Sequence, residues 1–371
     1  MAYGDFLPMW VADMDFESPR EIIDAITERA KHGVFGYTSR YDSYCEAVKG
    51  WMDRRHGWGI KKEWIISTPG VVPALSLAMR AYTRPGDKVV VQSPVYHLFY
   101  PVIKSSGREV VESRLKLVGN RYEMDYENLD RVLDEGAGML ILCSPHNPVG
   151  RVWEEDELRE LARICINRDV LIISDEIHSD LIMEGYKHTS MACLSDEIAD
   201  RTVTCTSASK TFNLAGLACA NIIIPNKEFR DQFDNVCRKL WIGTPNIFGL
   251  IATEAGYRYG EEWLEHLLGY LKGNYDFLVS YLNKELPMIR TAFLEGTYLA
   301  WLDFSALGLA EREIDELLLK DAGVQLDNGS KFGSGGEGFQ RINLACPKSV
   351  LKEGLDRIGN TVKWVSNPKD D

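Results

Sequence analysis

The chain has 371 residues, of which 45% are hydrophobic and 26% charged, and its formal net charge is −13. This composition is that of an ordinary soluble globular protein with a large core, and the length favours two domains. The acidic balance argues against a nucleic-acid-binding surface. No apolar run approaches the roughly 20 residues that a membrane span needs, so we expect no membrane partner.

Two further features bear on where the protein works. Residues 1–8 lack the basic and apolar regions of a signal peptide, so none is expected. The eight cysteines show neither CxxC pairs nor metal-like spacing with histidine, which predicts free thiols and no metal site. A reducing cytoplasm is the simplest location for such a chain.

The first predicted element that bears on chemistry is a strand over residues 65–67, which leads through a turn at Gly70 into a helical pattern from Val71. Glycine allows the backbone to turn tightly. The free N–H groups of Val71 and Val72, with the helix dipole behind them, can then bind an anion such as a phosphate. Many strand-to-helix turns bind nothing, so this pattern alone leaves the role of the turn open.

Apolar strand-like runs then alternate with helical patterns as far as about residue 224, which predicts an α/β fold with a mainly parallel sheet between helices. Strands are predicted at residues 88–92, 139–143, 170–174 and 201–206, with an amphipathic helix over 154–167. Long helical patterns follow to residue 281, and strand and helix are mixed after residue 290. We predict a large domain over 33–262, and a smaller α+β domain from 1–32 and 263–371.

Three of these strands end in polar residues, which suggests one active site at one edge of the sheet. Asn147 follows the strand at 139–143, Asp175 and His178 follow the next, and Lys210 follows the strand at 201–206. Each residue also has an ordinary structural interpretation. Asn147 could be a turn residue, Asp175 a helix or turn cap, His178 a hydrogen-bonded core histidine and Lys210 a solvated surface charge.

Read as a site, the same residues indicate a defined chemistry. Burial lowers the pKa of a lysine such as Lys210 and makes it a nucleophile. A carboxylate such as Asp175, facing a pyridine nitrogen, would keep that nitrogen protonated and make the ring an electron sink. His178 and Asn147 could both bond a hydroxyl on such a ring.

In combination, the motifs resemble a fold-type I pyridoxal-phosphate enzyme and, more narrowly, the MalY/PatB-type C–S lyases, also called cystathionine β-lyases. The resemblance covers essentially the whole chain. The motifs that carry it are Pro8-Met9-Trp10-Val11-Ala12-Asp13-Met14-Asp15-Phe16, Phe35-Gly36-Tyr37-Thr38, Thr68-Pro69-Gly70, Tyr96, Ser144-Pro145-His146-Asn147-Pro148, Ser174-Asp175-Glu176-Ile177-His178, Ser207-Ala208-Ser209-Lys210-Thr211-Phe212-Asn213 and Gly296-Thr297-Tyr298-Leu299-Ala300-Trp301-Leu302-Asp303-Phe304.

The resemblance implies a seven-stranded mixed sheet and a cofactor, pyridoxal 5′-phosphate. Lys210 would bind this cofactor covalently and later move the substrate α-proton, and Asp175 would pair with the ring nitrogen. Tyr96 would stack on the ring and act in catalysis and substrate binding, although a plain core aromatic is its ordinary interpretation. The remaining cofactor contacts would come from Gly70, Val71, Val72, Asn147, His178 and Ser207.

Two implied contacts involve more distant residues. Arg341, beside the apolar run 342–345, would bind the substrate α-carboxylate together with Asn147, because a guanidinium gives two parallel charge-assisted hydrogen bonds. Tyr37 would reach the cofactor phosphate of a neighbouring subunit, which implies a homodimer with shared active sites.

The sequence departs from related patterns at two places. Many aminotransferases of this fold carry a phosphate-binding arginine eight residues after the lysine, where this chain has Ala218. This difference favours the lyase branch. The chain also starts only a few residues before Trp10, whereas relatives usually have a longer N-terminal arm, so dimer contacts from such an arm are in question.

The resemblance therefore implies a β-lyase that cleaves L-cystathionine to homocysteine, pyruvate and ammonia, or that cleaves L-cysteine and related S-conjugates. One alternative is an aminotransferase that uses the same lysine and ring. Another is a regulatory protein that acts through protein contacts. The sequence does not select the thiol leaving group.

Overall fold

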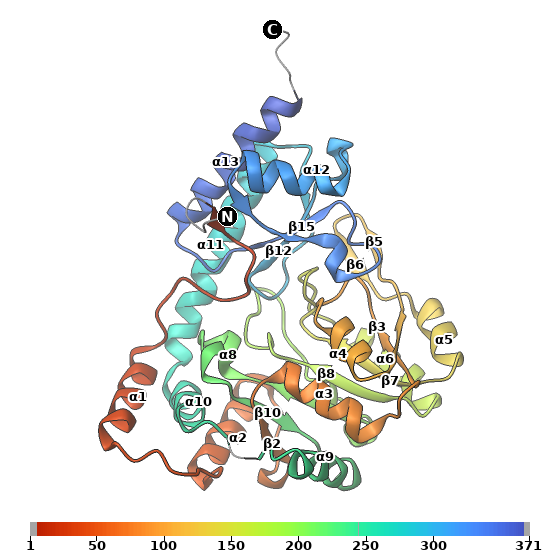
Figure 1. Cartoon of the computed structure of the whole chain (residues 1–371), viewed down its shortest axis with the longest axis vertical. Helices are drawn as coiled ribbons and strands as arrows, with labels where there is room; N and C mark the ends of the chain where they lie inside the picture. The colour runs from red at the N-terminus through yellow and green to blue at the C-terminus, as the bar shows by residue number, and fades with distance from the viewer. Residues whose placement is uncertain (1–5, 244, 367–371) are drawn as a thin grey trace.

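The computed structural model describes residues 6–243 and 245–366, and it contains a large sheet with helices on both faces and a smaller region around a second sheet (Figure 1). The large sheet has seven strands in the order β2-β10-β9-β8-β7-β3-β4. Strand β10 runs antiparallel to both of its neighbours, and the other neighbouring pairs in this sheet are parallel. The predicted α/β fold with a seven-stranded, mainly parallel sheet is confirmed. The strands are β2 (Ile65–Thr68), β3 (Lys88–Val91), β4 (Glu109–Glu112), β7 (Ala137–Cys143), β8 (Leu171–Asp175), β9 (Thr202–Thr206) and β10 (Ala220–Ile223).

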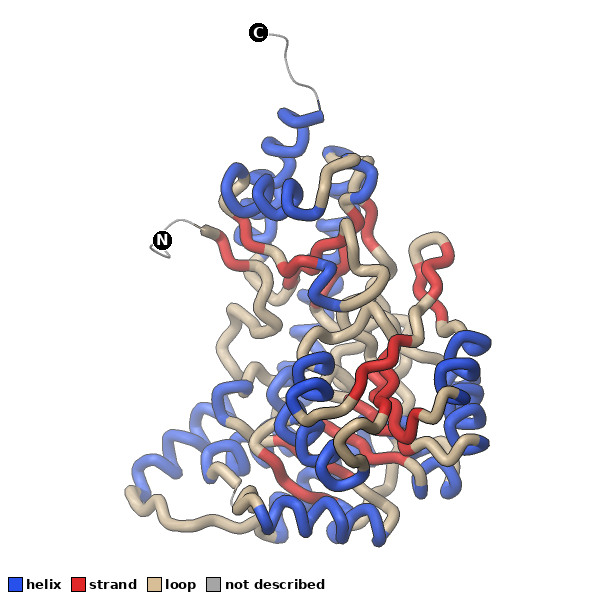
Figure 2. Tube along the Cα trace, turned by 45° about the vertical axis from the view of Figure 1, so that its right-hand side comes forward, coloured by secondary structure: helices blue, strands red, loops and turns tan. Residues whose placement is uncertain are grey.

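The central strands are apolar on both faces because helices cover both faces (Figure 2). In β7, Met139 and Ile141 point into the core shared with α3, α4 and α9, whereas Leu140 and Leu142 point into the core shared with α5 and α6. This alternation follows from the two-residue period of a strand. The covering helices are α3 (Val71–Tyr82), α4 (Phe99–Ser105), α5 (Tyr126–Asp134), α6 (Glu155–Asn167) and α9 (Lys227–Lys239).

A third core joins the remaining helices of the lower part of Figure 1 to the second sheet. Helix α11 (Glu261–Glu285) links the two parts and, at 1.5 Å per residue, is about 37 Å long. Helix α1 (Arg20–His32) packs against α10 (Ile247–Tyr259), which also packs against α2 (Asp42–His56). Short elements complete this part: α7 (Asp196–Asp200) and α8 (Ala208–Thr211).

The second sheet has four antiparallel strands in the order β11-β12-β15-β14. Strand β1, near the N-terminus, pairs in parallel with β13, so residues 7–8 lie with the C-terminal part of the chain. A hairpin of β5 and β6 stands apart from both sheets. These elements are β1 (Leu7–Pro8), β5 (Lys116–Val118), β6 (Arg121–Glu123), β11 (Arg290–Thr291), β12 (Leu299–Asp303), β13 (Val324–Gln325), β14 (Asp327–Asn328), β15 (Phe339–Asn343), α12 (Glu311–Glu316) and α13 (Lys348–Ser366).

The predicted division of the chain stays a prediction, and the N-terminal segment shows why it is difficult. Its residues 7–8 pair with β13, but α1 packs on α10, which belongs to the predicted large domain. Among the described residues, no helix is long and apolar enough to span a membrane.

Candidate active site

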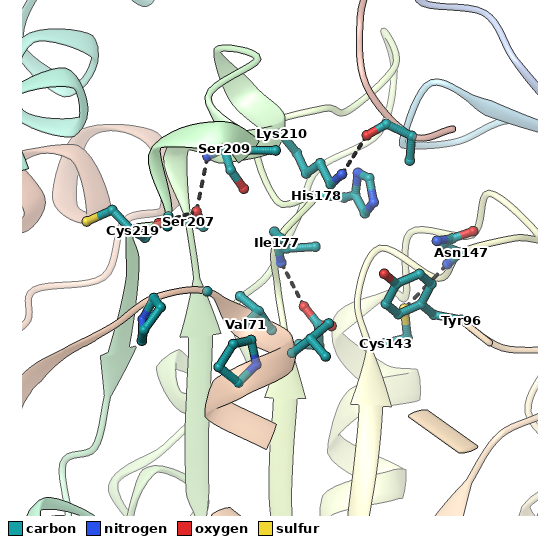
Figure 3. A pocket seen from close by; sticks show the side chains of 18 residues that line it. Val71, Tyr96, Cys143, Asn147, Ile177, His178, Ser207, Ser209, Lys210 and Cys219 are labelled. Atoms are coloured by element: carbon teal, nitrogen blue, oxygen red, sulfur yellow. Dashed lines mark hydrogen bonds between the residues drawn. The ribbon is translucent and has the colours of Figure 1, made fainter. Parts of the chain in front are cut away.

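The carboxyl ends of β7, β8 and β9 lie side by side, and a pocket opens above them (Figure 3). Parallel strands present their carboxyl ends at one edge, which is where ligands bind in open α/β sheets. Nine of the predicted site residues line this pocket: Gly70, Val71, Val72, Tyr96, Asn147, Asp175, His178, Ser207 and Lys210. Two predicted residues, Arg341 and Tyr37, do not.

Lys210 extends from the single-turn helix α8 into the pocket, where its Nζ donates a hydrogen bond of 2.5 Å to the Ala12 carbonyl oxygen. Burial lowers the pKa of this amine, and the nearby Arg341 lowers it further, while Asp13 and Asp175 oppose the shift. A lower pKa increases the fraction of neutral amine, which is the form that attacks a carbonyl and accepts a proton.

Asp175 ends β8 at the base of the pocket and is 4% exposed. Its side chain accepts a hydrogen bond from the Ile177 N–H, at 3.2 Å, and no other donor is found for it among the described residues. Burial raises the pKa of this carboxyl to about 7, although the Ile177 N–H and Lys210 act in the opposite direction. A cationic N–H donor in the pocket would restore its ionisation.

The turn at Gly70 leads from β2 into a helix, as the sequence predicted. Helix α3 begins at Val71, and a Cβ added at Gly70 would make an ordinary contact of 3.4 Å with Pro73 Cδ. The N–H groups of Val71 and Val72 belong to the first turn of this 12-residue helix, where they have no intrahelical acceptors. They therefore remain available to an anion at the pocket floor.

The two serines before Lys210, Ser207 and Ser209, differ in their hydrogen bonds. The Ser207 hydroxyl donates to the Cys219 carbonyl oxygen at 2.7 Å and accepts from the Ser209 N–H, which caps α8. Ser209, which the sequence prediction did not select, also lines the pocket, and its hydroxyl has no hydrogen bond to another described residue. The spacing Ser-x-Ser-Lys could have identified it, because it places two hydroxyls beside the lysine.

Three polar side chains complete the wall. The Tyr96 phenol stays neutral, because burial and the nearby Asp175 raise its pKa to about 12. His178 is also neutral, because burial first, and then Lys210 and Arg341, hold its pKa well below the ordinary value. Its Nδ1 is buried without a partner among the described residues. Asn147 faces Tyr96 in Figure 3, and its backbone N–H contacts Cys143 Sγ.

Arg341 lies on β15, 2% exposed and just outside the pocket wall. Its guanidinium donates to Asn147 Oδ1 at 3.0 Å, to the Trp10 carbonyl oxygen at 2.8 Å and to Asp327 Oδ2 at 2.8 Å. The bond to Asn147 holds the amide oxygen and leaves the amide NH₂ for another acceptor. Arg341 Nε is buried with no partner among the described residues.

The N-terminal segment 10–13 crosses the mouth of the pocket, which the sequence prediction did not anticipate. Buried side chains hold its carbonyl oxygens: Tyr298 donates to Ala12 at 2.8 Å, and Asn343 donates to Val11 and Asp13. The motif around Trp10 was part of the resemblance, but no pattern in it indicated a contact with Lys210.

Tyr37 and Ala218, two further positions considered in the sequence, lie in different surroundings. Tyr37 lies in the irregular segment between α1 and α2, fully exposed to solvent and away from the pocket of its own chain. Ala218, eight residues after Lys210, does line the pocket, with a left-handed backbone at φ 48°. No side chain from this position therefore carries positive charge into the pocket.

A family model described as aminotransferase class I and II matches residues 5–358. The chain belongs to this family. Cystathionine beta-lyase PatB of Bacillus subtilis (strain 168) is 45% identical over 95% of this chain and 92% of that protein. The resemblance to MalY/PatB-type proteins is confirmed.

Solved structures of high similarity agree with this placement. Cystalysin from Treponema denticola, which contains a pyridoxal 5′-phosphate cofactor, is 40% identical with a TM-score of 0.94, over 97% of this chain and 92% of that chain. A PLP-bound protein from Clostridium difficile 630, named as a candidate aminotransferase, is 47% identical with a TM-score of 0.95, over 96% of this chain and 92% of that chain.

Proposed function

We propose that the protein is a pyridoxal-phosphate-dependent C–S β-lyase. Its substrates are L-cystathionine, which gives homocysteine, pyruvate and ammonia, and L-cysteine or related S-conjugates. The observation that carries this proposal is the pocket itself, which combines the amine of Lys210, whose pKa is lowered, with the buried carboxyl of Asp175, which has no cationic hydrogen-bond partner among the described residues. Ala218 in the pocket wall favours lyase over aminotransferase chemistry.

The described residues fit the cofactor. Asp175 has no cationic partner in its buried position, and a pyridinium N–H would supply one. The free N–H groups of Val71 and Val72, and the hydroxyl of Ser209, suit a phosphate. The Asn147 amide, and His178 with its unpaired Nδ1, suit a ring oxygen. When bound, pyridoxal phosphate supplies an electron sink for negative charge at the substrate Cα.

Each side chain then has a role in the elimination. Lys210 would hold the cofactor covalently, and as a free amine it would be the base that removes the substrate α-proton. Asp175 would keep the nitrogen of a bound ring protonated, and Tyr96 would contact that ring. Arg341 binds the substrate carboxylate through its free Nε side while it orients Asn147. The thiolate leaves from Cβ, and the released aminoacrylate hydrolyses to pyruvate and ammonia.

An aminotransferase is the second candidate, since one similar structure carries that name. The experiment that separates the two uses the purified holoenzyme with L-cystathionine and no keto acid. We expect pyruvate and a free thiol in equal amounts over many turnovers, and none from Lys210→Ala. A requirement for an added keto acid would overturn the lyase proposal.

We also propose that the protein acts as a homodimer with shared active sites. The support is a set of exposed aromatic side chains, since such groups commonly mark protein interfaces. Tyr37 is 101% exposed, Phe35 57% and Trp241 94%. Tyr37 cannot serve its own pocket from this position, but it could serve the phosphate of a second copy. The cytoplasmic location stays a prediction; all eight cysteines are free thiols.

Mixing two inactive or impaired variants tests the shared site. In a heterodimer of Tyr37→Phe and Lys210→Ala protomers, one active site receives both intact residues if Tyr37 acts across the interface. We expect activity above that of either parent homodimer. If the mixed sample shows only the activity of its parents, while size-exclusion chromatography confirms exchange, then Tyr37 does not act on the partner's site.

A further inference from the structure

The segment 175–180, which leaves β8, has two faces with different partners. Asp175 and His178 line the pocket. Glu176 and Asp180 do not, and both are buried behind the pocket, 1% and 4% exposed. A short turn thus carries pocket residues on one side and two buried carboxylates on the other.

The two buried carboxylates are fully paired. Glu176 accepts hydrogen bonds from Ser174 Oγ at 2.8 Å, from His188 Nε2 at 3.1 Å and from the Met191 N–H at 3.0 Å. The rings of His188 and His56 meet edge to face at 5.5 Å. Through this contact, the pair formed by Glu176 and His188 lies next to the pair formed by Asp180 and His56.

Asp180 joins three separate segments of the chain. It accepts hydrogen bonds from Trp51 Nε1 at 3.0 Å and His56 Nε2 at 2.9 Å, both on α2, and from Thr211 Oγ1 at 2.7 Å, on α8. Thr211 is 1% exposed and directly follows Lys210. Among the described residues, the turn that carries Asp175 and the helix that carries Lys210 are thus joined directly by a hydrogen bond from the Thr211 hydroxyl to the Asp180 carboxylate.

Helix α8 needs such external contacts. It has four residues, Ala208–Thr211, and a helix of one turn is not stable by itself. The Ser207 cap fixes its start, and Asn213 is tied to the carbonyl oxygens of Met14 and Phe16 just beyond its end. Within the helix, the Thr211 hydroxyl makes a side-chain bond to the rest of the protein on the face away from the pocket.

We propose that Asp180 and Thr211 are positioning residues that hold Lys210 in register with Asp175 and His178. The Asp180–Thr211 hydrogen bond holds α8, which carries Lys210, against the turn that carries Asp175. Neither residue lines the pocket. They act through Lys210, and displacement of a reacting group by about 1 Å can cost on the order of 100-fold in rate.

The inference rests on the role of Lys210 in the proposed function, and a matched pair of variants tests it. Thr211→Val keeps the shape of the side chain and removes the hydroxyl, whereas Thr211→Ser keeps the hydroxyl. In the holoenzyme with L-cystathionine, we expect Thr211→Val to lower kcat about tenfold with KM within about twofold of wild type. Thr211→Ser should retain kcat within about twofold.

A second readout uses the cofactor-free protein and needs no turnover. The rate of Lys210 acetylation is followed against pH by mass spectrometry, with the 81%-exposed Lys284 as the internal reference. Lys210 is surrounded by Asp13, Asp175 and Arg341, and burial depresses its pKa. If Thr211→Val releases α8, Lys210 becomes more exposed, and its labelling midpoint should rise toward the ordinary value of a lysine. Thr211→Ser should leave it unchanged.

Three results would overturn the inference. A lower melting temperature for Thr211→Val, with kcat and the labelling midpoint of wild type, would show a purely structural role. An equal loss in Thr211→Ser would show that the hydroxyl is not the important group. An unchanged midpoint with a reduced kcat would place the defect elsewhere. Failure of the lyase proposal itself is distinguishable, because labelling does not depend on which reaction the holoenzyme catalyses.

Discussion

Asp175 and Asp180 lie five residues apart and are equally buried, each 4% exposed, but their surroundings differ. Asp175 faces the pocket with the Ile177 N–H as its donor, and its pKa is raised to about 7. Burial also acts to raise the pKa of Asp180, but bonds from His56 and Thr211, and the charge of Arg55, outweigh it and lower the pKa. A buried carboxyl with a single backbone donor keeps acceptor positions for a ligand, whereas one bound by several side-chain donors holds structure in place.

The largest expected effect is the loss of lyase activity when a residue on the pocket face, Lys210, is replaced. Lys210→Ala removes both the covalent attachment of the cofactor and the base, so lyase activity should fall by roughly 10⁴-fold or more. Borohydride reduction of wild type should fix the cofactor to Lys210, with no fixed adduct in the variant, as read by peptide mass spectrometry. An adduct on a different lysine would contradict the assignment.

Asp175→Asn comes next, because the amide cannot keep the ring nitrogen charged. We expect kcat for pyruvate formation to fall on the order of 100-fold, with little loss of folding stability. The matched control is Glu176→Gln, on the rear face of the same turn. If both variants lose activity equally, then the distinction between the two faces is wrong.

The raised pKa of Asp175 also predicts how stability depends on pH in the cofactor-free protein. Between about pH 4 and pH 7 the folded state holds a proton that the unfolded state has lost, so this residue's contribution to stability declines as pH rises through that window. The full loss is worth up to about 4 kcal/mol. In urea unfolding, the free energy of unfolding of Asp175→Asn should therefore increase relative to that of wild type between pH 4.5 and pH 8. Bound cofactor should reverse this increase.

The smallest expected effect is the loss of stability in Glu176→Gln. Burial acts to raise the pKa of Glu176, but hydrogen bonds from His188, Ser174 and Met191 outweigh it, so the carboxylate is stabilised as the anion. Removing the charge should cost about 2 kcal/mol of unfolding free energy near pH 7. The cost should shrink as pH falls below the ordinary pKa of a glutamate. A cost that stays constant down to pH 3 would contradict this account.

Sequence patterns predicted much of the fold and of the pocket. The short apolar runs within 88–92 and 139–143 were predicted to be strands, and both belong to the central sheet. Polar residues at the ends of parallel strands must meet at one edge, which brought Asn147, Asp175 and Lys210 together. The turn at Gly70 was predicted from the strand and helix patterns on either side of it, although Gly70 itself, at φ 166°, has an extended backbone that other residues also adopt.

Other features depend on which segments meet in space, and sequence gave no local signal for them. The contact of Lys210 with the Ala12 carbonyl oxygen joins residues 198 positions apart. The contacts of Arg341 with Asn147, Asp327 and Trp10 could not be predicted from its neighbours in sequence. The sequence also did not predict on which side of the turn Glu176 and Asp180 lie.

The sequence alone determined the α/β class, the edge of the sheet that carries the chemistry, and the residues able to perform it, because strand period, turn chemistry and side-chain type are local. Only the tertiary structure decided which buried carboxyl has no side-chain donor among the described residues. That choice depends on donors from α2, α8 and the segment around His188, which approach Glu176 and Asp180 from one side and leave Asp175 open to the pocket on the other.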